Sequence, residues 1–144
     1  MINHRIEGTT ISLTIKVLSD IAIQPSDMAR TLIQTQLRLR TYIRTHYRAE
    51  EDVLLPGDNP YVSDKRFTGC YVGVSTWPME GRKRLKYGML DISLTGIFDV
   101  LYREERFVSA EFFVVDDEFG RVGVGIVNRN RPGTRSVVPE VSNA

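Results

Sequence analysis

The sequence TTISLTIKV at residues 9–17 alternates polar and apolar side chains. Because successive side chains of a strand point to opposite faces, its apolar members share one face of an extended chain. These members are Ile11, Leu13, Ile15 and Val17. The stretch therefore predicts a strand with one buried face and one wet face, and it places the N-terminal part of the chain in a sheet.

A helix is predicted directly after this strand. In Pro25-Ser26-Asp27, the side chain of Ser26 or Asp27 can accept hydrogen bonds from the free N–H groups of a first helical turn. We expect the helix to run from about Asp27 to Arg48. Its apolar residues fall within one narrow arc of the helical wheel, which predicts the face turned to the core. This arc holds Met28, Leu32, Leu39 and Ile43, with Tyr47 at its edge.

The rest of the chain is predicted to form loops and strands. Residues 50–65 contain two prolines and a glycine and predict a loop, and residues 67–75 predict a strand. Three further strands are expected at residues 87–100, 107–115 and 121–127. The expected fold class is α+β, with one long helix packed on a mainly antiparallel β-sheet and a C-terminal three-stranded meander.

Two glycines are expected to shape the last of these strands. Gly123 and Gly125 occupy alternate positions, so they share one face, whereas Val122, Val124 and Ile126 share the other. Glycine inside a strand often marks a place where a second backbone or a helix comes close. We therefore expect such a close approach at this face.

Composition and length indicate one globular domain. The chain has 144 residues, of which 42% are hydrophobic and 26% are charged. We expect residues 1–128 to form a single α+β domain and residues 129–144 a flexible C-terminal tail or arm. Cys70 is the only cysteine, which excludes an intramolecular disulfide and fits a reducing compartment. No stretch approaches the ~20 apolar residues of a membrane span, and no signal peptide is expected.

The motifs of common enzyme classes are absent from the sequence. It contains no phosphate-binding loop, no His-Glu-x-x-His and no Gly-x-Ser-x-Gly element. His4, His46 and Cys70 do not form a metal-ligand spacing, and Cys70 is interpreted as a small buried hydrophobe. Residues 116–118, Asp-Asp-Glu, are interpreted as an acidic turn rather than a cation site. We therefore predict a binding or structural protein without catalytic residues, cofactor or metal.

Two basic clusters are candidate sites for an anionic partner. The first is an arginine stripe within one quarter of the helical wheel, and the second follows Trp77 in the loop before residue 87. The candidate residues are Arg30, Arg40, Arg44, Arg48, Arg82, Lys83, Arg84, Lys86 and Trp77. Arginine matches phosphate and carboxylate as a planar fork, so lipid headgroups, nucleocapsid or nucleic acid are possible partners. The other interpretation of each cluster is a solvated face or link.

The C-terminal tail is a candidate self-association arm. Its cationic and apolar side chains can dock on another copy of the chain, and the alternative is a frayed end. The residues concerned are Arg129, Arg131, Arg135, Val137 and Val138.

Two segments resemble a known family. Residues 5–17, RIEGTTISLTIKV, followed by Ser26-Asp27, are similar to the first core strand and helix start of rhabdovirus matrix proteins. Residues 87–95, YGMLDISLT, resemble a later strand of that family. The Lys-rich N-terminal tail and Pro-rich budding motifs of the animal-virus members are absent, so a shortened, plant-virus-like member is the better match.

The resemblance implies a structural role in a virus. A matrix protein associates with itself, condenses the nucleocapsid and contacts the inner leaflet of the membrane. It is found in the virion and host cytoplasm, at the membrane periphery, and in some cases in the nucleus. A phage or plasmid accessory structural protein would share most of these expectations.

The main alternative is a cone-like α+β protein with a small-ligand pocket between the long helix and the sheet. Such folds host binding modules and small enzymes. The polar groups expected around that pocket are Tyr42, His46, Asp99 and Glu111.

Overall fold

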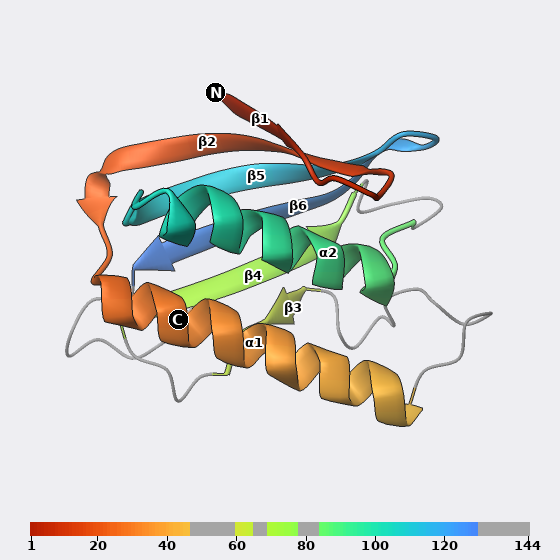
Figure 1. The fold of residues 1–144 in the computed structure, drawn as a ribbon, viewed down its shortest axis with the longest axis horizontal. Coiled ribbons are helices and arrows are strands. Elements are labelled where there is room, and N and C mark those ends of the chain that lie inside the picture. Colours follow the sequence, from red (N-terminus) through yellow and green to blue (C-terminus); the bar gives the residue numbers. More distant parts are fainter. Residues whose placement is uncertain (47–59, 65–68, 78–83, 130–144) are drawn as a thin grey trace.

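The computed structural model describes residues 1–46, 60–64, 69–77 and 84–129. Over these ranges the chain forms a six-stranded antiparallel sheet in the order β1-β2-β5-β6-β4-β3, and helices cover one face of it (Figure 1). The strands are β1 (Ile2–Arg5), β2 (Ile11–Ala22), β3 (Tyr61–Val62), β4 (Cys70–Thr76), β5 (Val108–Asp116) and β6 (Gly120–Arg129). The helices are α1 (Pro25–His46) and α2 (Tyr87–Ile97), and α2 continues as a π-helix, η3 (Phe98–Arg103).

The strand predicted at residues 9–17 is the first part of β2. Ile11, Leu13 and Ile15 are fully buried against the helices, whereas Thr14 is partly buried and Lys16 is exposed. The apolar alternation therefore corresponds to a covered face and an uncovered face, as expected. β2 continues to Ala22, beyond the predicted end, with an irregularity in its pairing to β5 after Leu18.

The predicted long helix is α1. It begins at Pro25, so Ser26 and Asp27, which were expected to cap it, lie inside its first turn. A proline is favourable at this first position because the first helical N–H has no partner within the helix. Met28, Leu32 and Leu39 are buried, which confirms the predicted core arc. Tyr47 lies outside the described residues. The hydroxyl of Thr31 donates to the backbone oxygen of Cys70 at 3.1 Å and ties this face of α1 to β4.

The prediction of a strand at residues 87–100 is wrong, because these residues belong to α2 and η3. Leu90, Leu94, Ile97 and Leu101 recur every three or four positions and are all buried, as in a helix. Gly96 allows a close approach to the sheet. A Cβ atom there would lie 2.7 Å from a Cδ1 atom of Leu13.

The expected fold class is therefore corrected. The fold is α+β, but α2 and η3 join α1 on the covered face, and the C-terminal strands do not form a three-stranded meander. The last two strands, β5 and β6, form a hairpin at the centre of the sheet, where β2 pairs with β5 and β4 pairs with β6. The edge strands β1 and β3 were not predicted.

The close approach predicted at Gly123 and Gly125 is present. The ring of Phe112, a buried side chain on β5, lies over Gly125, so that a Cβ on Gly125 would be 2.7 Å from one ring carbon. A Cβ on Gly123 would be 3.3 Å from the methyl groups of Leu85. Glycine at these two positions therefore lets bulky apolar side chains reach the backbone of β6.

Replacing Gly125 by Ala should destabilise the protein. The added methyl group overlaps the ring of Phe112 and lies 2.9 Å from the backbone oxygen of Gly73, so a central strand or the ring has to shift. Overpacking of this kind costs about 1–3 kcal/mol of unfolding free energy, which urea denaturation would measure.

Gly73→Ala is the matched control. An added Cβ at Gly73 would meet the backbone oxygen of Tyr61 at 3.8 Å, which is an ordinary contact. We expect its unfolding free energy to stay within about 0.5 kcal/mol of the wild type. Equal stability of the two variants would contradict the packing of Phe112 on Gly125.

Candidate functional site

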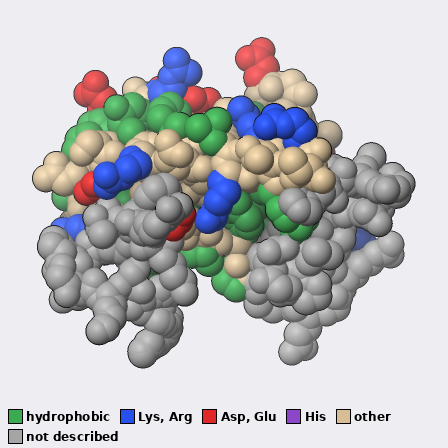
Figure 2. Space-filling view, turned by 90° about the horizontal axis from the view of Figure 1, so that it is seen from below, with side chains coloured by type: hydrophobic (Ala, Val, Ile, Leu, Met, Phe, Trp, Pro, Cys, Tyr) green, Lys and Arg blue, Asp and Glu red, His purple; other side chains and the backbone are tan. Residues whose placement is uncertain are grey.

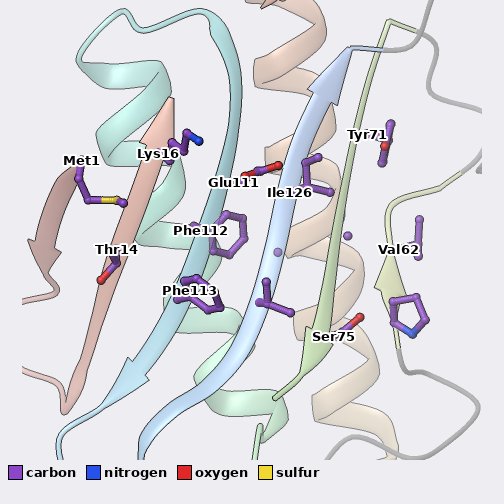
Figure 3. Close-up of a pocket in the computed structure, with 14 residues that line it drawn as sticks. Met1, Thr14, Lys16, Val62, Tyr71, Ser75, Glu111, Phe112, Phe113 and Ile126 are labelled. Atoms are coloured by element: carbon purple, nitrogen blue, oxygen red, sulfur yellow. The ribbon is translucent and has the colours of Figure 1, made fainter. Parts of the chain in front are cut away.

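The candidate site is a hollow on the uncovered face of the sheet, which we call the trough (Figure 3). It encloses about 640 Å³, within the range of small-molecule sites. Strand register builds its floor from two rows of side chains that cross the sheet. One row is Lys16, Glu111, Ile126, Gly73 and Val62, and the other is Thr14, Phe113, Val124 and Ser75.

The middle of the trough is apolar. An antiparallel sheet with one wet face normally carries polar side chains on that face. Here Phe113, Val124 and Ile126 lie side by side on β5 and β6 and are only partly buried. An exposed apolar patch of this kind often marks an interaction site.

An aromatic corner borders the trough. The rings of Trp77 and Phe113 meet edge to face, with centroids 5.9 Å apart, and Trp77 is 38% exposed. The guanidinium carbon of Arg121 lies 3.9 Å from the centroid of Phe113. A bulge between β5 and β6 pairs Arg121 with Val115 and so places it on the same face as Phe113.

The same bulge corrects one detail of the sequence analysis. Val122 was expected on the face of Val124 and Ile126, but it is fully buried whereas those two are only partly buried. The register shift could not be anticipated from the alternation of residues 121–127.

The described residues that were expected to line a pocket between the long helix and the sheet do not come together. Tyr42 packs on the ring of Tyr87, with centroids 5.4 Å apart, on the helical side. Asp99 lies on η3 with Arg103 at 3.4 Å, and Glu111 lies on the opposite face of the sheet. These groups do not converge, and the side chain of His46 lies outside the described residues.

The predicted arginine stripe is partly paired. Arg30 forms an ion pair with Asp27 at 2.8 Å, and Arg40 forms one with Asp91 at 2.9 Å. Arg44 is exposed and has no carboxylate partner among the described residues. Arg48 lies outside the described part of the chain.

Two apolar side chains lie between these arginines. Ile33 is 43% exposed and Leu37 is 51% exposed. We call the set Arg30, Ile33, Leu37, Arg40 and Arg44 the outward face of α1, because their spacing of three and four residues places them together, opposite the buried arc. Figure 2, the view from below, shows several blue Lys and Arg side chains on this side of the molecule, some of them next to red Asp and Glu side chains.

The described residues of the second basic cluster do not form one continuous basic surface. Arg82 and Lys83 lie outside the described residues. The guanidinium carbon of Arg84 lies 4.2 Å from the centroid of Phe119, and Lys86 directly precedes α2. Trp77 belongs to the aromatic corner of the trough.

The predicted arm lies almost wholly outside the described residues. Arg131, Arg135, Val137 and Val138 are not described. Arg129 is the last residue of β6, and its guanidinium donates to the backbone oxygen of Ala22 at 3.4 Å.

The acidic residues 116–118 form a structured turn. The carboxylate of Asp116 accepts hydrogen bonds from the hydroxyl of Thr10 at 2.8 Å and from the N–H groups of Glu118 and Phe119 at 2.9 and 3.1 Å. Burial raises the pKa of Asp116, but these hydrogen bonds outweigh it, so the pKa lies below its usual value. Asp117 forms an ion pair with Arg5 at 2.7 Å. The cluster therefore closes the β5–β6 hairpin.

Cys70 is a buried residue of β4, as predicted. Burial raises the pKa of its thiol to about 12, so the thiol is protonated at neutral pH. Among the described residues, no group of three or more His, Cys, Asp or Glu side chains is placed to hold a metal ion. No described helix is long and apolar enough to cross a membrane.

Comparison with known proteins finds no relative. No protein-family model, no curated protein and no solved structure matches the chain.

Cys70 should resist alkylation in the folded protein. The thiolate is the reactive form, and both burial and a pKa of about 12 suppress it at pH 8. Iodoacetamide should label the native protein far more slowly than the protein in concentrated urea, as mass spectrometry would show. Labelling of the native protein at the rate of a free thiol would contradict the position of Cys70.

Asp116→Asn should lower stability in a pH-dependent way. A carboxyl with a lowered pKa stabilises the fold above its unfolded pKa of about 3.9, and this contribution is lost as pH falls through the folded pKa. The variant should therefore lose about 1–3 kcal/mol at pH 7, and the difference from wild type should narrow below about pH 4. Urea denaturation across this pH range measures both quantities.

Asp117→Asn is the control, because its ion pair with Arg5 is exposed and should contribute little. A pH-independent deficit in Asp116→Asn would exclude its carboxylate as the source of the stabilisation.

Proposed function

We propose that this protein is a matrix-type structural protein that binds an anionic membrane surface through the outward face of α1. The supporting observation is the arrangement of that face, in which the exposed side chains of Ile33 and Leu37 lie between arginines. Helices that lie on membranes combine cationic side chains with apolar side chains that enter the headgroup region.

The charge of α1 favours phosphate-bearing partners. Between Pro25 and His46 the helix carries four arginines and one carboxylate, that of Asp27. The ion pairs of Arg30 and Arg40 are at the surface, where such pairs contribute little and their arginines can exchange partners. Together with Arg44, they can therefore approach lipid phosphates.

The wider matrix role rests on the resemblance of residues 5–17. In this protein that segment forms the end of β1 and the first part of β2, in keeping with a core strand. Residues 87–95, the second similar segment, belong to α2 and not to a strand, so they lend no support. Self-association and nucleocapsid binding belong to this proposal as consequences of the family likeness.

Variants of the outward face of α1 should weaken binding to anionic vesicles. An arginine near a membrane surface contributes about 1 kcal/mol, so Arg44→Ala should reduce the affinity for phosphatidylserine-containing vesicles about fivefold at low salt. Ile33→Ser with Leu37→Ser should weaken binding at low and high salt, because it removes apolar contact. Co-sedimentation with vesicles measures both effects, with pure phosphatidylcholine vesicles for comparison.

Arg103→Ala is the charge-matched control. Arg103 lies on η3 and is highly exposed, and its removal changes the net charge by the same amount. We expect it to bind like the wild type. Equal losses for Arg44→Ala and Arg103→Ala would mean that net charge, and not the outward face of α1, governs binding, and the proposal would be rejected.

A further inference from the structure

The trough has a polar end and an apolar end. Lys16 on β2 and Glu111 on β5 are directly opposite in the strand register, and both are exposed. Further across the sheet, the same row contains Ile126 on β6, Gly73 on β4 and Val62 on β3 (Figure 3). In this row, charge is therefore confined to Lys16 and Glu111, and the members beyond them are apolar.

The two charges at the polar end do not form a close ion pair with each other. No ion pair joins Lys16 and Glu111, although they face each other across neighbouring strands, and neither pairs with another described residue. A cation and an anion thus stand side by side at one end of an apolar hollow. This arrangement is complementary to a group that carries both charges.

The shape of the trough fits an elongated apolar chain. From β2 to β3 it crosses four strand spacings, about 19 Å. Gly73 keeps the floor open, because the nearest described atoms to the space where its side chain would stand belong to Tyr61 and Val62, at 3.8 Å or more. Phe113 and Val124 form the parallel row on one side of this path.

We propose that the trough binds a single-chain zwitterionic amphiphile. Its chain lies over Ile126 and Gly73 toward Val62. Its anionic group pairs with the ammonium of Lys16, and its cationic group pairs with the carboxylate of Glu111. The carboxylate of a fatty acid would pair with Lys16 but would be repelled by the carboxylate of Glu111. The ammonium of an alkyl amine would pair with Glu111 but would be repelled by Lys16.

This site is independent of the membrane-binding proposal. The trough lies on the face of the sheet away from the helices, whereas the outward face of α1 lies beyond the helical layer (Figure 1). A ligand in the trough is therefore a single amphiphile and not the bilayer that α1 would contact. Failure of either proposal leaves the other standing.

The test is a titration with four dodecyl amphiphiles below their micelle-forming concentrations. They are dodecyl dimethylglycine, whose ammonium is next to the chain and whose carboxylate is terminal, dodecanoate, dodecylamine and dodecyl maltoside. The fluorescence of Trp77, the only tryptophan, reports occupancy because its ring packs on Phe113 beside the trough. Isothermal titration calorimetry gives the affinities independently.

The wild type should bind dodecyl dimethylglycine about fivefold more tightly than either singly charged amphiphile, as expected for one exposed ion pair. Lys16→Met should shift the preference to dodecylamine, and Glu111→Gln should shift it to dodecanoate. Both side chains are exposed, so these variants are expected to fold. Equal affinity for all four amphiphiles, or no binding, would overturn the proposal.

Gly73→Phe tests the location of the chain. Its backbone conformation is open to any residue and its Cβ makes ordinary contacts, so the new ring should fill the trough and abolish binding. Circular dichroism and urea denaturation check that the variant is folded. Wild-type affinity in folded Gly73→Phe would place the ligand elsewhere and overturn the proposal. If Gly73→Phe does not fold, Ile126→Asp supplies the same test, because Ile126 is only partly buried.

Discussion

The contact between the ring of Phe112 and the backbone of Gly125 organises the covered face of the sheet. Phe112 is among the largest buried side chains, and it sits on β5 at the centre of the sheet. Because Gly125 has no side chain, the ring can lie across the neighbouring strand instead of standing between sheet and helices. The helical layer can then pack closely over the hairpin of β5 and β6. No described helix covers the opposite face, and the trough lies there.

The parts of the fold that the sequence predicts are those with a single clear period. The alternation in residues 9–17 and the amphipathic pattern after Pro25 correspond to β2 and α1. Residues 87–101 are so rich in apolar side chains that both a strand period and a helix period fit them. The choice between the two depends on contacts far along the chain, such as Gly96 against Leu13, which a local pattern does not contain. The short edge strands carry too few residues for any period to show.

The candidate sites also separate into features that a local sequence pattern reveals and features that depend on the pairing of distant strands. The arginines of α1 were evident from their helical spacing, and Ile33 and Leu37 could have been found from the same wheel as apolar residues opposite the buried arc. The trough could not be found, because its rows arise from the register of five strands. Glu111 was selected from the sequence as part of a different pocket. Only its pairing with Lys16 shows which face it occupies and which charge it meets.

The strand order also has a consequence for how the chain folds. Ile11 pairs with Asp116, so β2 finds its central neighbour only after both helices and most of the chain have been synthesised. Until β5 emerges, β2 can pair only with the short β1, and its apolar residues have no sheet to join. Sheets closed by such long-range pairing form slowly and expose apolar strands on the way. We therefore expect the pairing of β2 with the C-terminal hairpin to be a late step in folding, which leaves the apolar residues of β2 without their partner strand until then.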